Sequence, residues 1–239
     1  MYARFVRDAE LSGVSIVAAG SLNPAIIHPL WLSEKGLIPE NLAQYAIDKN
    51  QGPAVTTPQL SVFVADWLSV QVTQEQAVFS TVEEGRQYDL RDFAAGLFTL
   101  LPETPIDAIG INADTHFRLE SETVWHQFGD RFLPKEFWEP LFTEDHWKQR
   151  SDGKRVGMRS MTVEVNRQDS SPGYVRTELG PSVRVTPNGI FAGINCHYQL
   201  TTSVDRRKNA MEARRVLLDE WETARGMQID LVKQLLEAV

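Results

Sequence analysis

Two short stretches of the sequence resemble each other and carry the residues best suited to bind a ligand. Residues 109–119 read IGINADTHFRL, and residues 192–200 read AGINCHYQL. Each contains Gly-Ile-Asn, followed further on by a histidine, an aromatic residue, one polar residue and a leucine. Carboxamide, carboxylate and imidazole groups can exchange hydrogen bonds or protons with a ligand. The candidate ligand-binding residues are therefore Asn112, Asp114, His116, Asn195 and His197.

Both stretches alternate apolar and polar side chains, which predicts strands with one buried and one polar face. The candidate residues share the polar face, opposite Ile111 and Ile194. If a pseudo-two-fold axis relates the two stretches, His116 and His197 would occupy equivalent positions with the asparagines beside them. The simpler interpretation is an ordinary polar face covered by water or by a helix.

Other common reaction centres have no support in the sequence. No histidine pair has the HxxxH or HExxH spacing of a helical metal site, and we expect no metal and no cofactor. Cys196 lies on the predicted core face, next to His197 on the opposite face, so a buried inert thiol is favoured over a nucleophile. Nucleotide-binding loops and a GxSxG turn are absent from the sequence. No catalytic residue can be assigned.

The first part of the chain predicts strands around one helix. We expect a strand at 13–20, a β-rich segment at 59–72 with a bend near Ala65-Asp66, and a strand at 77–82. Apolar residues at three- and four-residue spacing predict a helix over 89–101, with Asp89 as its N-cap. A long strand is expected at 106–119. Two short helices are expected within 23–50.

The second part predicts a three-stranded meander and a helical tail. Strands are expected at 156–167, 173–186 and 190–202, joined by turns at Asp169–Gly173 and Pro187–Gly189. Residues 205–239 predict one long helix or two abutting ones, with Gly226 as the kink or junction. The apolar residues of this tail alternate steps of four and three, which is a coiled-coil-like seam.

These elements predict an α+β fold in a single domain spanning residues 1–239. Its antiparallel sheet would combine two half-repeats, at about 13–120 and 155–239, packed by helices. An aromatic-rich helical segment at 121–150 would join the halves. The predicted sheet is continuous across both halves.

The order of these elements resembles an uncharacterised family of sporadically distributed prokaryotic proteins of similar length. The likeness lies in Trp67 to Val72, the helix at 89–101 and the strand IGIN at 109–112, followed by a C-terminal helix. It covers residues 60–120 and the meander, whereas the stretch 23–42 and the aromatic segment fall outside it. The resemblance implies the fold and a role beside partner proteins, and it implies no reaction.

Two sets of apolar residues are candidates for protein contacts. Aromatic side chains of the segment 121–150 could pack on the core or lie outward as interface residues. The seam of the C-terminal helix could bind a second copy or dock on its own sheet. The candidate interface residues are Trp138, Phe142, Trp147, Trp221, Leu231 and Leu235.

Composition restricts the possible partners. The formal net charge is −8, which argues against nucleic acid as a partner. The local exception is a basic group that could bind phosphate: Arg206, Arg207, Lys208, Arg214 and Arg215. No apolar run is long enough to cross a membrane. With one cysteine and no recognisable signal peptide, we expect a reducing cytoplasm.

Together these features favour a non-catalytic interaction or structural subunit of a cytoplasmic prokaryotic complex. Self-association, as a homodimer, is the expected form. The alternative is an enzyme or small-ligand-binding protein that uses the Asn/Asp/His polar face.

Overall fold

The computed structural model describes residues 9–48, 54–138, 158–167, 172–200 and 209–237. The strands are β1 (Ala9–Gly20), β2 (Val55–Thr56), β3 (Leu60–Ala65), β4 (Leu68–Thr73), β5 (Gln76–Thr81), β6 (Ile106–Arg118), β7 (Met161–Asn166), β8 (Gly173–Pro181) and β9 (Gly189–Gln199). The helices are α1 (Pro29–Glu34), α2 (Glu40–Ile47), α3 (Gln87–Leu100), α4 (Glu122–Phe132), α6 (Asn209–Asp219) and α7 (Trp221–Glu237), with short 3₁₀ helices η1 (Pro24–Ile26) and η2 (Lys135–Phe137).

The described strands form one nine-stranded sheet in the order β2-β3-β4-β5-β1-β6-β9-β8-β7. Every neighbouring pair is antiparallel. The predicted α+β class, the antiparallel sheet and the long C-terminal helix are confirmed. The origin of the sheet in two half-repeats stays a prediction.

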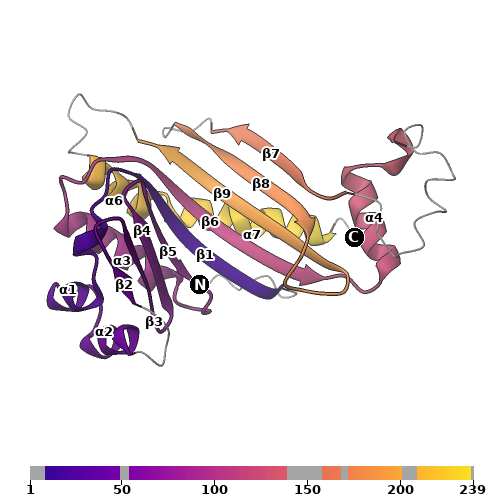
Figure 1. Cartoon of the computed structure of the whole chain (residues 1–239). Helices are drawn as coiled ribbons and strands as arrows, with labels where there is room; N and C mark the ends of the chain where they lie inside the picture. Colours follow the sequence, from indigo (N-terminus) through magenta and orange to yellow (C-terminus); the bar gives the residue numbers. More distant parts are fainter. Residues whose placement is uncertain (1–8, 49–53, 139–157, 168–171, 201–208, 238–239) are drawn as a thin grey trace.

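Helices α3, α6 and α7 cover one face of this sheet, and in Figure 1 they lie behind it. The strands direct every second side chain to these helices, as the fully buried Ile16, Ile111 and Cys196 show. Leu217 and Trp221 of the helical layer complete the same core. The opposite face has no described helix across it. We call these two sides the covered face and the open face of the sheet.

The aromatic segment packs partly as a second core. Trp125 and Phe128 of α4 are buried, and they lie against Phe117 and Ile190 at one end of the long central strands. The indole nitrogen Nε1 of Trp125 donates a hydrogen bond to the carbonyl oxygen of Gly189 at 3.2 Å. This hydrogen bond satisfies the polar atom of a buried tryptophan.

The predicted β-rich segment 59–72 with a bend near Ala65-Asp66 is confirmed, and the bend is a full reversal: β3 and β4 form a hairpin at Asp66, whose φ is +55°. Two other predicted details are wrong. Helix α3 begins at Gln87 with Arg86 as the N-cap residue, while Asp89 accepts a hydrogen bond from Arg86 at 2.7 Å. The C-terminal segment forms two abutting helices, as one predicted alternative had it, but they meet at Glu220, and α7 continues through Gly226.

Gly226 is tolerated inside α7 because no neighbouring side chain or strand approaches it within 4 Å. A glycine on an exposed helix surface costs only about 1 kcal/mol of propensity and need not bend the helix.

Helix α7 docks on its own sheet through Gln228. Its Nε2 donates to the carbonyl oxygen of Ile111 at 2.7 Å and to that of Ile194 at 3.3 Å. Ile111 and Ile194 belong to the adjacent central strands β6 and β9. One side chain therefore ties the C-terminal helix to both central strands.

Trp221 allows this docking to be tested. It is only 1% exposed, so we expect Trp221→Ala to lower the free energy of unfolding by about 3–5 kcal/mol through lost burial and a cavity. Leu218→Ala, at a side chain 37% exposed in α6, is the matched control and should cost about 1 kcal/mol or less. Chemical denaturation of both variants measures the difference. Equal stability of the two variants would contradict the packing of Trp221 in its own core.

Candidate functional site

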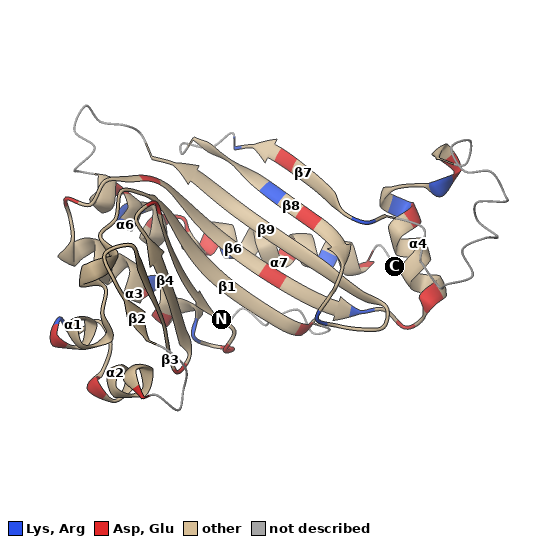
Figure 2. Ribbon diagram, viewed as in Figure 1, with Lys and Arg blue, Asp and Glu red and all other residues tan. Residues whose placement is uncertain are grey.

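The open face of the sheet carries a row of polar residues that faces no described helix. Strand register places these residues directly opposite one another from strand to strand. In order across the sheet they are Ser69, Ser80, Ser15, Asn112, Asn195, Arg176 and Glu164. Charged positions lie on β7 and β8, whereas β9 has none (Figure 2). The centre of the row is thus neutral and rich in amide and hydroxyl groups.

The two similar sequence stretches lie side by side in this row. Asn112 pairs directly with Asn195 across β6 and β9, so the local two-fold axis of the antiparallel pair passes between them. The same axis relates Gly110 to Gly193. It relates His197 to Asp114 rather than to His116, so the two histidines do not occupy equivalent positions.

The strand register also separates these histidines. His197 is opposite Gly110, while His116 is opposite Phe191. Gly110 and His116 are six residues apart on β6, which is about 20 Å at the rise of an extended strand. One small ligand therefore cannot contact both imidazoles, and the predicted shared histidine site is not formed.

The paired asparagines leave one buried oxygen without a hydrogen-bond donor among the described residues. Nδ2 of Asn112 donates to the hydroxyl oxygen of Ser15 at 3.3 Å. Oδ1 of Asn195 is buried and accepts no hydrogen bond from the described residues. A Cβ added to Gly110 would lie 3.2 Å from this oxygen, so the glycine leaves the space that the two amides use.

His197 packs against an aromatic ring. Its ring stacks on that of Tyr174, with centroids 4.4 Å apart and an angle of 11° between the planes. Burial lowers the pKa of His197, and the charge of Arg176 adds to this effect. The stacked, uncharged ring extends the flat surface beside the asparagines.

His116 has a structural role. Its Nδ1 lies 2.8 Å from the hydroxyl oxygen of Ser182, which also accepts hydrogen bonds from the backbone N–H groups of Arg184 and Val185. Since these two donors occupy the lone pairs of the hydroxyl, its hydrogen is donated to Nδ1, and the neutral imidazole carries its proton on Nε2. Ser182 is therefore held as a turn-stabilising acceptor, which is a poor arrangement for a nucleophile.

The remaining candidate chemistry is also weak in the described part of the chain. Cys196 faces the core, and burial raises the pKa of its thiol to about 11, so the thiolate is disfavoured. No three His, Cys, Asp or Glu side chains among the described residues are grouped closely enough to hold a metal ion.

The predicted interface residues occupy different environments. Trp138 is 39% exposed beside Phe137, and their rings are 5.0 Å apart. Trp221 is buried in the main core, Leu235 packs against the second core, and Leu231 is half-buried. Phe142 and Trp147 lie outside the described residues. Helix α7 thus uses much of its apolar surface within its own chain.

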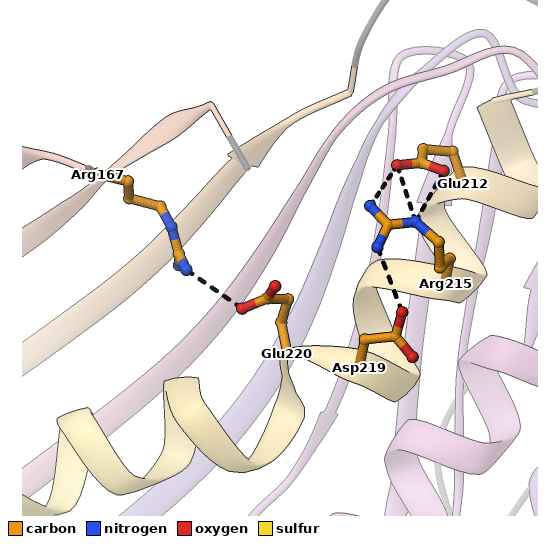
Figure 3. A network of polar contacts seen from close by, with 5 residues as sticks. All are labelled: Arg167, Glu212, Arg215, Asp219 and Glu220. Atoms are coloured by element: carbon orange, nitrogen blue, oxygen red, sulfur yellow. Dashed lines mark hydrogen bonds and ion pairs between the residues drawn. The ribbon is translucent and has the colours of Figure 1, made fainter. Parts of the chain in front are cut away.

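Part of the basic group is neutralised. Arg215 contacts Glu212 at 2.6 Å and Asp219 at 3.3 Å, as Figure 3 shows. Arg214 is half-buried in α6, whereas Arg206, Arg207 and Lys208 lie outside the described residues. With two carboxylates beside it, Arg215 is a weak candidate for binding phosphate.

Sequence reasoning did not identify β7 as an edge of the sheet. The alternation of Met161, Val163 and Val165 with polar residues predicts a strand, but it contains no information on the strand's neighbours. In the structure β8 is the one described strand that pairs with β7. Val163 and Val165 are 46% and 60% exposed on the side that faces the helical layer.

None of the described helices combines the length and the apolar character needed to cross a membrane.

The pH dependence of stability tests the role of His116. Burial lowers its pKa, Arg184 lowers it further and Asp114 partly opposes this. A histidine in the unfolded chain has a pKa near ~6.5, so below that pH the unfolded state takes up a proton that the native imidazole resists. This contribution to stability is complete above the unfolded pKa and is lost as the pH falls.

We expect His116→Gln, which can still accept from Ser182, to reduce the fall in melting temperature between about pH 7 and pH 5.5. Thermal unfolding across this range, with the wild type in the same buffers, measures the slope. If the melting temperatures of the variant and the wild type change identically with pH, His116 does not contribute to the pH dependence of stability.

No protein-family model matches the sequence, and no curated protein matches it.

Proposed function

We propose that the protein is a non-catalytic interaction subunit that self-associates through the edge strand β7, so that two copies form one continuous sheet. The observation that carries this proposal is the outer edge of β7, with which no described strand pairs, together with its exposed valines. The same proposal includes a cytoplasmic location and a role beside partner proteins, which the family resemblance implies.

The backbone of β7 offers hydrogen-bonding groups for a further strand. The N–H of Arg167 donates to the carbonyl oxygen of Gly173 at 2.9 Å, which makes this a hydrogen-bonded pair of the antiparallel ladder. Because such pairs alternate along a ladder, Val165 and Val163 also direct their backbone groups to β8. Thr162, Glu164 and Asn166 then direct theirs to the outer edge, where no described strand pairs with them.

The side chains of β7 favour pairing with a second β7. In an antiparallel pair centred on Val163, Val163 would be opposite its counterpart, and Met161 would be opposite Val165. On the other face, Glu164 would be opposite Thr162. Apolar pairs would therefore meet on one face, and no like charges would be directly opposed on the other.

The edge lacks several devices that prevent strand addition. Proline and lysine are absent from β7, whose sequence is MTVEVN. Its one charged residue, Glu164, already pairs with Arg176 at 2.7 Å on the neighbouring strand. An edge of this kind, with apolar side chains 46% and 60% exposed, is suited to β-sheet extension.

A second candidate is binding of a small polar ligand on the open face. The buried Oδ1 of Asn195, which has no donor among the described residues, favours it. A ligand hydroxyl or amide could donate to that oxygen beside Asn112 and His197. If this function holds, Asn195→Leu should abolish the stabilisation that a polar small-molecule screen detects in the wild type by thermal shift.

Self-association is tested by substituting lysines for the exposed valines of the edge strand β7. We expect wild-type protein to be a dimer at micromolar concentration and Val163→Lys/Val165→Lys to be a 27.0 kDa monomer, because like charges would then be opposed across the pair. Size-exclusion chromatography with light scattering gives both masses.

Val183→Lys is the matched control, since Val183 is 91% exposed in the connection between β8 and β9, outside β7, and the substitution should leave the dimer intact. A monomeric wild type, or a dimer that persists in the double variant, would refute the proposal.

A further inference from the structure

Arg225 of α7 is an arginine buried beneath the covered face of the sheet. It is 7% exposed, and two amide oxygens accept hydrogen bonds from it. Nη1 donates to Oε1 of Gln228 at 2.5 Å, and Nη2 donates to Oε1 of Gln87 at 3.2 Å. Nε of Arg225 has no acceptor among the described residues.

The charge of Arg225 lacks a close counterion in the described part of the chain. Burial lowers its pKa to about 10, which still leaves the guanidinium protonated at neutral pH. Glu222 and Tyr88 attract it only from a distance, and they hydrogen-bond to each other at 3.2 Å. By contrast, buried Arg167 pairs with Glu220 at 3.3 Å (Figure 3). A buried charge without a partner is unfavourable, so the surroundings of Arg225 favour an anion.

A small cavity adjoins this guanidinium. It measures about 20 Å³ and is lined by Arg225, Gln87 and Gln228, together with residues of β1 and β6. Ser12 and Thr115 contribute from the sheet, where they are direct cross-strand partners. Neither hydroxyl forms a side-chain hydrogen bond with another described residue, so both can donate into the cavity.

We propose that this cavity binds one monatomic anion of the size of chloride, held by the guanidinium of Arg225 and the hydroxyls of Ser12 and Thr115. A space of about 20 Å³ holds one or two water-sized particles. Sulfate and phosphate have five heavy atoms each and are too large. The donors come from one helix and two adjacent strands, so a bound anion would hold α7 to the sheet.

An anion that binds the folded chain alone stabilises it in a concentration-dependent way. Melting temperature is therefore measured in sodium chloride and in sodium gluconate, at equal ionic strength. We expect a saturable rise with chloride and with bromide, and no comparable rise with gluconate. Arg225→Gln should lose the chloride response, whereas Arg215→Gln, at an exposed arginine of α6, should retain it.

Crystals of the wild-type protein grown in bromide give a second readout that does not depend on a foldable variant. An anomalous peak in the cavity beside Arg225 supports the proposal. The proposal is overturned by a cavity without such a peak, by chloride and gluconate responses that are equal in the wild type, or by an unchanged response in Arg225→Gln.

Discussion

The pairing of β6 with β9 is the interaction on which the rest of the structure depends. It joins the six strands that precede residue 119 to the three that follow residue 160. Its inner face supplies Ile111 and Cys196 to the main core, and its outer face supplies the paired asparagines. Gln228 donates to a carbonyl oxygen on each strand, so the helical layer is aligned on this same pair.

Because the described helices cover one face of the sheet and none of them lies across the other, polar residues of the sheet have two distinct environments. Those on the open face, such as Asn112 and His197, form a surface of amides and stacked rings. Those on the covered face must be satisfied locally, since water does not replace a lost hydrogen bond there. Arg225 of α7 is one buried residue on that side for which this satisfaction is incomplete among the described groups. On the opposite face, Nδ1 of His116 is engaged by the hydroxyl of Ser182 at the end of the sheet.

The local pattern of the sequence predicts much of this fold. Alternation correctly assigned Asn112 and Asn195 to one face and Ile111 and Cys196 to the other, because side-chain direction in a strand depends only on position. The turn at Asn188 was also predictable, since its φ of +60° suits asparagine.

Long-range arrangement was harder to predict. No local signal distinguishes a central strand from the edge strand β7, and none reveals that Glu220, rather than Gly226, ends a helix. The two similar stretches differ by an offset of two residues, which keeps each side chain on the same face of the sheet. The prediction of equivalent histidine positions considered this face alone. Register, however, also fixes position along the strand, and this separates His116 from His197.

The position of β9 has a consequence for synthesis of the chain. Asn112 and Asn195 are neighbours in space but 83 residues apart in sequence (195 − 112). While a ribosome is still translating the intervening residues, β1 to β6 can already assemble, with one side of β6 unoccupied. Such an open edge is where nascent chains associate wrongly and where chaperones bind. Strand β6, which is central in the complete sheet, is thus an exposed edge strand during synthesis and the place where wrong association is most expected.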